Sequence, residues 1–180
     1  MKPNVNKSVF FLSIGLCALL TFLLCFADSA SAEFSKRVQI TIHASQVAGG
    51  SPLIDFPVMI KLNGSQFQQI ENDIGPNGYD IQFRASDETT PLTHEIETYD
   101  ETNDLLTAWV KIPSLSNSSD TVIYMYYGDS SISSPTHNPP GVWNSTFGAV
   151  WHLKEDPALA GSGGIEDSTG NNNHGTDKGA

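Results

Sequence analysis

The chain has 180 residues, of which 20 are Asp or Glu and 9 are Lys or Arg, so its formal net charge at pH 7 is −11. Binding to nucleic acid or to an anionic membrane surface needs clustered Lys and Arg side chains, and the sequence has no such cluster. We therefore expect no nucleic-acid partner, and an acidic surface that suits a solvated protein or one that collects calcium.

The first 32 residues have the pattern of a secretory signal peptide. Lys2 and Lys7 precede an apolar run from Val9 to Ala27, and the small-residue triplet Ala30-Ser31-Ala32 follows it. The run is long enough to cross a bilayer, so a retained anchor is the alternative, although no basic stop-transfer cluster follows. We expect cleavage after Ala32, a secreted, periplasmic or cell-surface protein, and contact with the membrane only through the leader before cleavage.

Cysteine and histidine positions exclude two kinds of stabilising site. Cys17 and Cys25 both lie inside the leader, so the mature chain would have no disulfide framework. The five His residues are scattered, without a pair spaced for zinc. The sequence also contains no nucleophile elbow, Cys–His pair or phosphate-binding loop.

From residue 33 to residue 128 the chain alternates short strand-like stretches with clusters of Gly, Pro, Asn, Asp and Ser. Apolar and polar residues alternate within the stretches before residue 121, which is the pattern of a half-buried β-strand. The stretches are 37–43, 56–62, 79–84, 92–99, 105–112 and 121–127. Residues 65–72 predict a short helix or a loop.

Two of these stretches give specific predictions about burial. In 79–84 the alternation places Tyr79, Ile81 and Phe83 inward and Asp80 outward. The stretch 121–127 is apolar on both faces, which predicts a central strand that is covered on two sides.

The closely spaced strands predict an all-β protein. A long amphipathic helix is missing from the pattern, so an antiparallel β-sandwich, jelly-roll-like, is favoured over any α/β fold. This sandwich would span residues 33–128. Residues 129–146 are rich in Ser, Pro, Asn and Gly, which is typical of a linker between folded units.

Four sequence blocks, in order, resemble those of the DUF2341 family. The blocks are Asp80–Arg84, Pro91–Glu97, Trp109–Pro113 and Tyr124–Gly128. The resemblance spans about residues 37–128. The family is a domain of unknown function in exported, often multidomain, prokaryotic proteins, so the resemblance implies an exported module and no catalytic residues.

Residues 147–180 resemble the entry to a laminin-G or concanavalin A-like lectin domain. The resemblance rests on Trp151-His152-Leu153 and on the Asn-rich run from Asp167 to Thr176. About thirty residues of this kind cannot bury a core of their own. We therefore expect a truncated start of such a domain, in a chain that is a fragment of a longer protein; the alternative is a vestigial tail.

Glu95 and Glu97 are the candidate catalytic residues. They are two positions apart in the stretch 92–99, so their side chains would share one strand face, roughly 6 to 7 Å apart. Glycoside hydrolysis uses two carboxylates about 5 to 10 Å apart. The alternative is that both acids face solvent or that one pairs with Arg84.

Trp109, Tyr99 and Tyr127 are the candidate ligand-binding residues, because sugar rings stack on exposed aromatic faces. Trp109 alternates with the apolar residues of the stretch 105–112 and so lies on the opposite face. The alternative is that Trp109 fills a core.

Asp167, Asn171 and Asn173 are the candidate metal ligands. They offer hard oxygen atoms in a glycine-bounded loop, which is the ligand type that calcium prefers. Their spacing does not match an EF-hand, and Asn- and Asp-rich turns also bond their own backbone.

We therefore expect an exported, non-enzymatic β-sandwich module for carbohydrate recognition or cell-surface attachment. Its partner would be a polysaccharide or a cell-surface glycan. We expect no cofactor, with calcium as the alternative. The first alternative is a polysaccharide-degrading enzyme, or its accessory domain, that uses Glu95 and Glu97. The second alternative is a structural spacer that contacts only other domains or proteins.

Overall fold

The structure is a computed structural model that describes residues 34–155 and 164–176. The predicted leader at residues 1–32 lies outside these residues, so the signal peptide stays a prediction. Across the described parts of the chain, no helix is both long and apolar enough to span a membrane.

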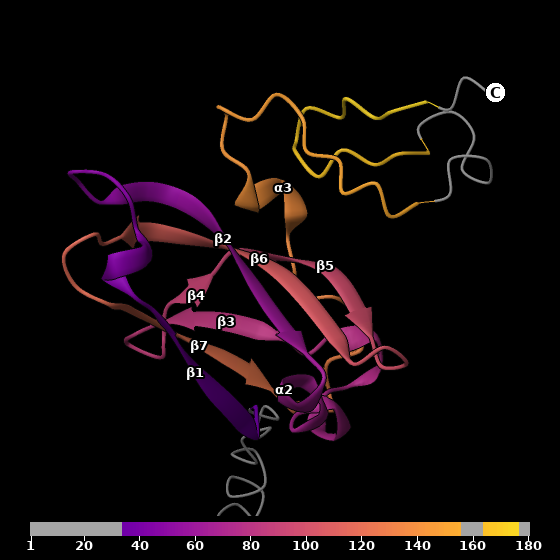
Figure 1. Cartoon of the computed structure of the whole chain (residues 1–180). Coiled ribbons are helices and arrows are strands. Elements are labelled where there is room, and N and C mark those ends of the chain that lie inside the picture. Colours follow the sequence, from indigo (N-terminus) through magenta and orange to yellow (C-terminus); the bar gives the residue numbers. More distant parts are fainter. Residues whose placement is uncertain (1–33, 156–163, 177–180) are drawn as a thin grey trace, which may run out of the picture. The chain divides into compact units, whose positions relative to one another are not determined.

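The strands form two antiparallel sheets that enclose one core (Figure 1). Sheet A has the strand order β1-β7-β3-β4, and sheet B has the order β2-β6-β5. The bounds are Lys36–Ile42 (β1), Leu53–Asn63 (β2), Gln82–Ala85 (β3), Pro91–Leu92 (β4), His94–Asp100 (β5), Leu105–Leu115 (β6) and Thr121–Tyr127 (β7). The predicted all-β sandwich is confirmed.

Short helical turns connect the strands. They are η1 (Ala44–Gln46), α2 (Ser65–Gln68), η2 (Glu71–Asp73), η3 (Pro76–Gly78) and α3 (Pro139–Val142). The stretch 65–72, predicted as a short helix or a loop, contains α2 and the start of η2. Phe67 of α2 is fully buried, so this turn closes one end of the core.

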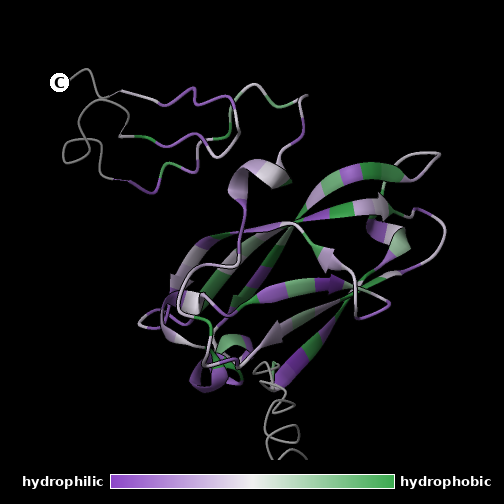
Figure 2. Ribbon diagram, turned by 180° about the vertical axis from the view of Figure 1, so that it is seen from behind, coloured by the Kyte–Doolittle hydropathy of each residue, from purple (hydrophilic) through white to green (hydrophobic). Residues whose placement is uncertain are grey.

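Strand β6 buries its apolar face in the core, as the period-two pattern predicts. On β6, Leu106, Ala108, Val110 and Ile112 are at most 2% exposed, while Trp109 points to the outer face of sheet B. Figure 2 shows the same alternation of hydrophobic and hydrophilic residues along the strands. The outer face of sheet B is therefore available to other parts of the chain.

Strand β7 is central in sheet A, between β1 and β3, as predicted. Ile123 and Met125 are buried in the core. On the other face, the guanidinium of Arg37 lies 5.0 Å from the centre of the Tyr124 ring, and that of Arg84 lies 4.3 Å from the Tyr126 ring. These cation–π contacts cover the outer side of the strand.

The prediction that Asp80 points outward is wrong. Asp80 is 1% exposed, and its carboxylate accepts hydrogen bonds from the backbone N–H groups of Gly75, Gly128 and Asp129 at 2.8 to 3.1 Å. Residue 80 precedes β3, so the alternation rule for strands does not apply to it. The side chain instead ties the η3 turn to the chain after β7.

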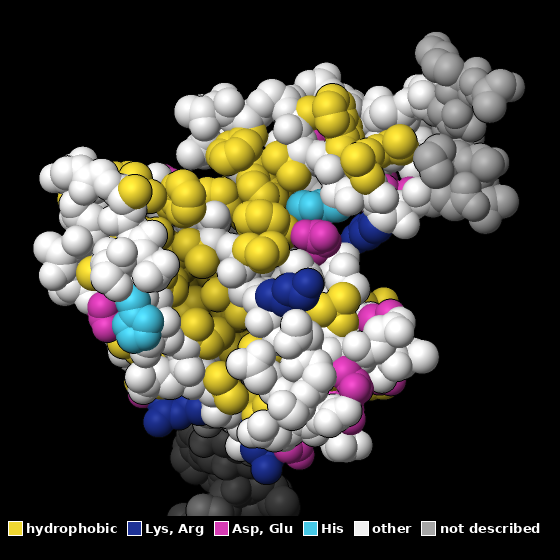
Figure 3. All heavy atoms as spheres, in the orientation of Figure 1, with side chains coloured by type: hydrophobic (Ala, Val, Ile, Leu, Met, Phe, Trp, Pro, Cys, Tyr) yellow, Lys and Arg dark blue, Asp and Glu magenta, His cyan; other side chains and the backbone are white. Residues whose placement is uncertain are grey.

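The edge strand β2 carries exposed apolar side chains. Ile54, Phe56 and Met59 are 66%, 42% and 50% exposed. Figure 3 shows hydrophobic side chains gathered on the side of the molecule that it presents. Asp55 has a φ of 49° and no partner in β6, and Pro57 offers no backbone N–H group. Both features limit pairing of this edge with another strand.

Candidate functional site

The candidate acids lie on β5, next to Trp109 of β6. Glu95 is paired across the strands with Trp109, and a bulge between Ile96 and Thr98 leaves Glu97 as the extra residue. Trp109 Nε1 donates a hydrogen bond to Glu97 Oε2 at 2.6 Å. Arg84 does not pair with these acids, because its guanidinium donates to Gln82 and to the Glu88 carbonyl.

The chain beyond β7 returns to this face of sheet B. We use the name C-terminal segment for the described residues 147–155 and 164–176. Within the expected linker, residues 129–146, Val142 and Trp143 are buried, and α3 contacts β5 and β6. The boundaries predicted for the linker and for a following domain stay predictions.

Glu95 binds the chain beyond β7 to sheet B. The residue is buried, at 3% exposed. Glu95 Oε2 accepts a hydrogen bond from Trp143 Nε1 at 2.8 Å, and Oε1 accepts one from Ser168 Oγ at 2.6 Å. One carboxylate therefore holds two segments that follow it by 48 and 73 residues.

His152 lies between the two acids. Its Nε2 atom is 3.2 Å from Glu95 Oε1, and its Nδ1 atom is 3.2 Å from Glu97 Oε2. The ring lies nearly parallel to that of Trp109, with centroids 6.2 Å apart, and Trp143 packs against Trp109 at 5.3 Å. Two carboxylates, an imidazole and two indoles thus form one cluster on the outer face of sheet B.

The environment favours the charged forms of Glu95 and His152. Burial pushes the pKa of Glu95 up, but the neighbouring His152 imidazole and the hydrogen bonds from Ser168 and Trp143 outweigh burial and hold the pKa below its ordinary value of 4.5. The contact with Glu95 raises the pKa of His152 above 6.5, although burial opposes this shift. The two groups form an ion pair at mildly acidic pH.

Asp167 organises the loop at the end of the C-terminal segment. Its carboxylate accepts hydrogen bonds from the backbone N–H groups of Val150, Thr169 and Asn173, each at 2.9 Å. Although burial raises the pKa of Asp167, these hydrogen bonds and that of the Thr169 hydroxyl lower it to about 2. The carboxylate stabilises the loop as an acceptor of backbone hydrogen bonds.

The other two candidate calcium ligands also contact the backbone. Asn171 Nδ2 donates to the carbonyls of Phe147 and Gly148, and Asn173 Nδ2 donates to that of Gly148. Within residues 34–155 and 164–176, no group of three or more His, Cys, Asp or Glu side chains is placed to hold a metal. Calcium at Asp167, Asn171 and Asn173 stays a prediction.

Tyr99 and Tyr127 lie in different environments. Tyr127 is 5% exposed and belongs to the core between the sheets. Tyr99 is partly buried: its ring packs edge-on against Phe67 at 5.6 Å, and its hydroxyl donates to Glu101 Oε1 at 3.0 Å. Tyr99 thus has its ring against the core and its hydroxyl in a cleft.

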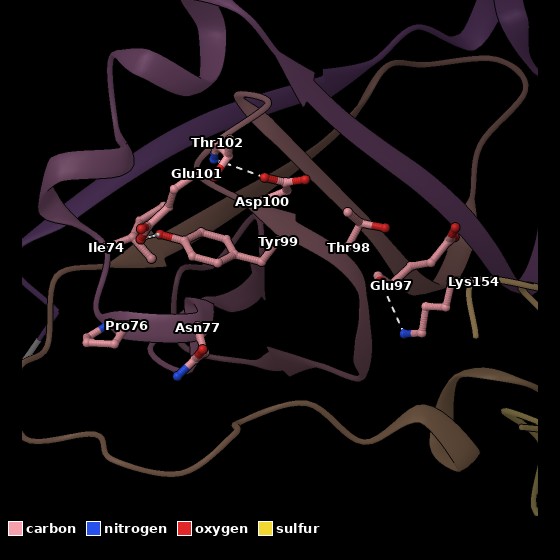
Figure 4. A pocket seen from close by; sticks show the side chains of 10 residues that line it. All are labelled: Ile74, Pro76, Asn77, Glu97, Thr98, Tyr99, Asp100, Glu101, Thr102 and Lys154. Carbon is pink, nitrogen blue, oxygen red and sulfur yellow. Dashed lines mark hydrogen bonds between the residues drawn. The ribbon is translucent and has the colours of Figure 1, made fainter. Parts of the chain in front are cut away.

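This open cleft, of about 730 Å³, follows β5 (Figure 4). Glu97, Tyr99, Asp100 and Glu101 line one side of it, and Ile74, Pro76 and Asn77 come from the η2–η3 region. Lys154 of the C-terminal segment completes the lining, and its Nζ atom donates to the Glu97 carbonyl at 3.0 Å. The cleft therefore combines acids, one base and a tyrosine hydroxyl.

The structure brings Glu95, Glu97 and Trp109 together, and it adds residues that sequence reasoning missed. His152, Trp143 and Ser168 are the missed partners, and Lys154 is a missed part of the cleft wall. Their distance along the chain from β5 leaves no local spacing signal. The one available hint is the group of aromatic residues in 143–151, in a stretch otherwise poor in core residues.

These features define the class of protein: an antiparallel β-sandwich with a buried polar cluster on the outer face of one sheet. A family model described as Domain of unknown function (DUF2341) matches residues 77–147. The match includes all four blocks of the sequence resemblance, as well as β5, β6 and Trp143. No curated protein and no solved structure matches the chain at a significant level. The lectin-like start predicted at 147–180 lies almost wholly beyond this match and stays a prediction.

Proposed function

We propose that the chain is an exported, non-enzymatic module that recognises carbohydrate, and that the cleft along β5 is its binding site. The main support for this proposal is the cleft itself. Its lining includes Tyr99, Asp100, Glu101 and Lys154, and its volume is about 730 Å³. Carboxylates and an ammonium group suit sugar hydroxyls, because each can form charge-assisted hydrogen bonds with them. The space is large enough for a short oligosaccharide.

The geometry favours recognition over hydrolysis. A general acid that works near neutral pH needs a raised pKa, whereas the pKa of Glu95 is lowered. Both Glu95 oxygens already accept hydrogen bonds, one from Trp143 and one from Ser168, and Glu97 accepts one from Trp109. We infer that these acids hold the fold, and a polysaccharide-degrading enzyme is the second candidate.

We also propose that the module is exported and is followed by a second carbohydrate-binding unit. The signal-peptide pattern at 1–32 supports export to the periplasm, the cell surface or the medium. The resemblance of 147–180 to a lectin domain supports a second carbohydrate-binding unit after the sandwich. A structural spacer between domains is the remaining alternative.

Glu101→Ala is expected to weaken glycan binding by about tenfold, because one charge-assisted hydrogen bond to a ligand is worth on the order of 1.5 kcal/mol. Glu101 is exposed, so the loss does not come from unfolding. The measurement is a glycan array followed by titration calorimetry with the best ligand. Asp55→Asn, on β2 and outside the lining of the cleft, is the matched control and should bind like the parent.

A reducing-sugar assay on the same proteins separates the alternatives. Hydrolysis that disappears in Glu95→Gln, while the variant stays folded, would establish the enzyme instead. Binding that is equal in Glu101→Ala and in the parent would remove the cleft as the site. Absence of both binding and hydrolysis in the parent would leave the spacer.

A further inference from the structure

The contacts of His152 depend on its protonation state. Its side chain is 9% exposed, and each ring nitrogen is 3.2 Å from a carboxylate oxygen, of Glu95 on one side and of Glu97 on the other. A neutral imidazole has one N–H group, so one nitrogen would turn a lone pair toward a carboxylate. The imidazolium has two N–H groups and suits both acids.

The contact between His152 Nε2 and Glu95 depends more on charge than on hydrogen bonding. This atom is buried and has no well-aligned hydrogen-bond acceptor among the described residues, despite its distance from Glu95 Oε1. Its attraction to Glu95 is therefore mainly that of opposite charges in a poorly solvated place. Such an attraction is lost when the imidazole loses its proton.

The other charged groups around His152 do not remove the attraction between its imidazolium and the two carboxylates. A polar pocket of about 290 Å³ beside the ring is lined by Glu155, Glu166 and Asp167 from the C-terminal segment and by His137 from the chain before α3. Burial lowers the pKa of His137 below its ordinary value of 6.5, which disfavours a second positive charge beside the ring. Lys154 is a cation whose charge opposes that of His152, and its ammonium already donates to the Glu97 carbonyl. The surroundings of His152 are thus acidic on balance.

We propose that His152 is a proton-operated latch: its imidazolium holds the C-terminal segment on sheet B, and loss of the proton loosens the segment there. Lys154, two residues further on, lines the cleft along β5, so loosening the segment moves one wall of that cleft. The latch goes beyond carbohydrate recognition. Its test needs no glycan, so the two proposals fail independently.

The direction of the pH effect follows from the two pKa shifts. Because the pKa of His152 is raised above 6.5, its contribution to docking is fully present below that pH and is lost as the pH rises through the raised value. Because the pKa of Glu95 is lowered from 4.5, its contribution is present above that pH and is lost as the pH falls through the lowered value. Docking is therefore tightest at about pH 5 to 6, between the two ordinary values.

The test follows hydrogen exchange of the Trp109 and Trp143 indole N–H groups, which donate to Glu97 and Glu95, in the full chain from pH 5.5 to 8.5. The exchange rate at each pH is divided by that of a free indole, which removes the pH dependence of the chemistry. We expect protection to fall as the pH rises, by about tenfold for each unit by which the pKa of His152 exceeds its ordinary value. Protection that is constant across this range would overturn the latch.

Three variants separate the latch from general effects of pH. In His152→Gln, protection should be low and independent of pH, and a slope like that of the parent would contradict the proposal. In Glu97→Gln, the midpoint should move to lower pH, because one of the two facing charges is gone; an unchanged midpoint also contradicts it. His43→Gln removes an exposed His that pairs with Asp120 at 2.9 Å, and it should keep the slope of the parent.

Discussion

Replacing Glu95 by alanine will lower the free energy of unfolding by about 3–5 kcal/mol, the range for removing one partner from a buried charged pair. The substitution removes the acceptor of two hydrogen bonds and one partner of an ion pair. The Trp143 indole N–H and the Ser168 hydroxyl would have no acceptor, and His152 would lose one of its two carboxylates. Each buried donor without an acceptor costs about 1–3 kcal/mol.

Glu95→Gln separates shape from charge. The amide keeps the volume of the side chain and can donate to the Ser168 hydroxyl while its oxygen still accepts from Trp143. Its NH₂ group would then face the His152 imidazolium in place of a carboxylate oxygen, so we expect a loss of about 2 kcal/mol. Denaturant unfolding at pH 6, followed by circular dichroism, measures both variants. Glu101→Gln on the same edge of the cleft is the control: its amide oxygen still accepts the Tyr99 hydroxyl, and its stability should stay within about 0.5 kcal/mol of the parent. A Glu95→Ala protein as stable as this control would show that Glu95 is not an anchor.

The second large effect is expected at Asp80. Asp80→Ala should cost at least about 3 kcal/mol, because the backbone N–H groups of Gly75, Gly128 and Asp129 would lose their acceptor. Gly128 presents its N–H group from a turn with φ of +84°, a conformation that favours glycine, so another acceptor cannot easily be reached by moving this turn.

Asp80→Asn tests the same contacts with little change in shape. It keeps one acceptor oxygen and turns an NH₂ group toward a backbone donor, so we expect a smaller loss of about 2 kcal/mol. Equilibrium unfolding in urea compares both variants with Asp55→Asn, where an exposed acid at positive φ is replaced by a residue that tolerates this conformation. If Asp80→Ala unfolds at the urea concentration of Asp55→Asn, the three hydrogen bonds do not stabilise the sandwich.

The sandwich could be predicted because the sequence pattern that specifies each strand lies within a few consecutive residues. Alternation of apolar and polar residues has a period of two in any strand with one buried face, so β6 and the central position of β7 follow from short stretches of sequence. The same rule failed at Asp80, which lies in a turn between η3 and β3. In a turn the side chain is directed by the backbone groups that it can bond.

The candidate site was predictable in part. Glu95 and Glu97 were expected on one face of a strand, and both contact His152 although β5 has a bulge between Ile96 and Thr98. Their partners could not be predicted in the same way. His152 and Ser168 follow Glu95 by more than fifty residues, and nothing in the spacing of a loop specifies which strand it covers. Burial of a carboxylate depends on such distant partners, so it is visible only in the folded chain.

The most direct measurement is nuclear Overhauser spectroscopy of the labelled full chain at pH 6. Docking on sheet B through Glu95 involves both Trp143, which follows α3, and the C-terminal segment. It places the Trp143 indole against the Trp109 ring, with centroids 5.3 Å apart, and places His152 beside both. We predict cross-peaks between the Trp143 and Trp109 ring protons and between His152 and each of the two indoles. An intact sandwich in which Trp143 and His152 show contacts only to their sequence neighbours would contradict this arrangement.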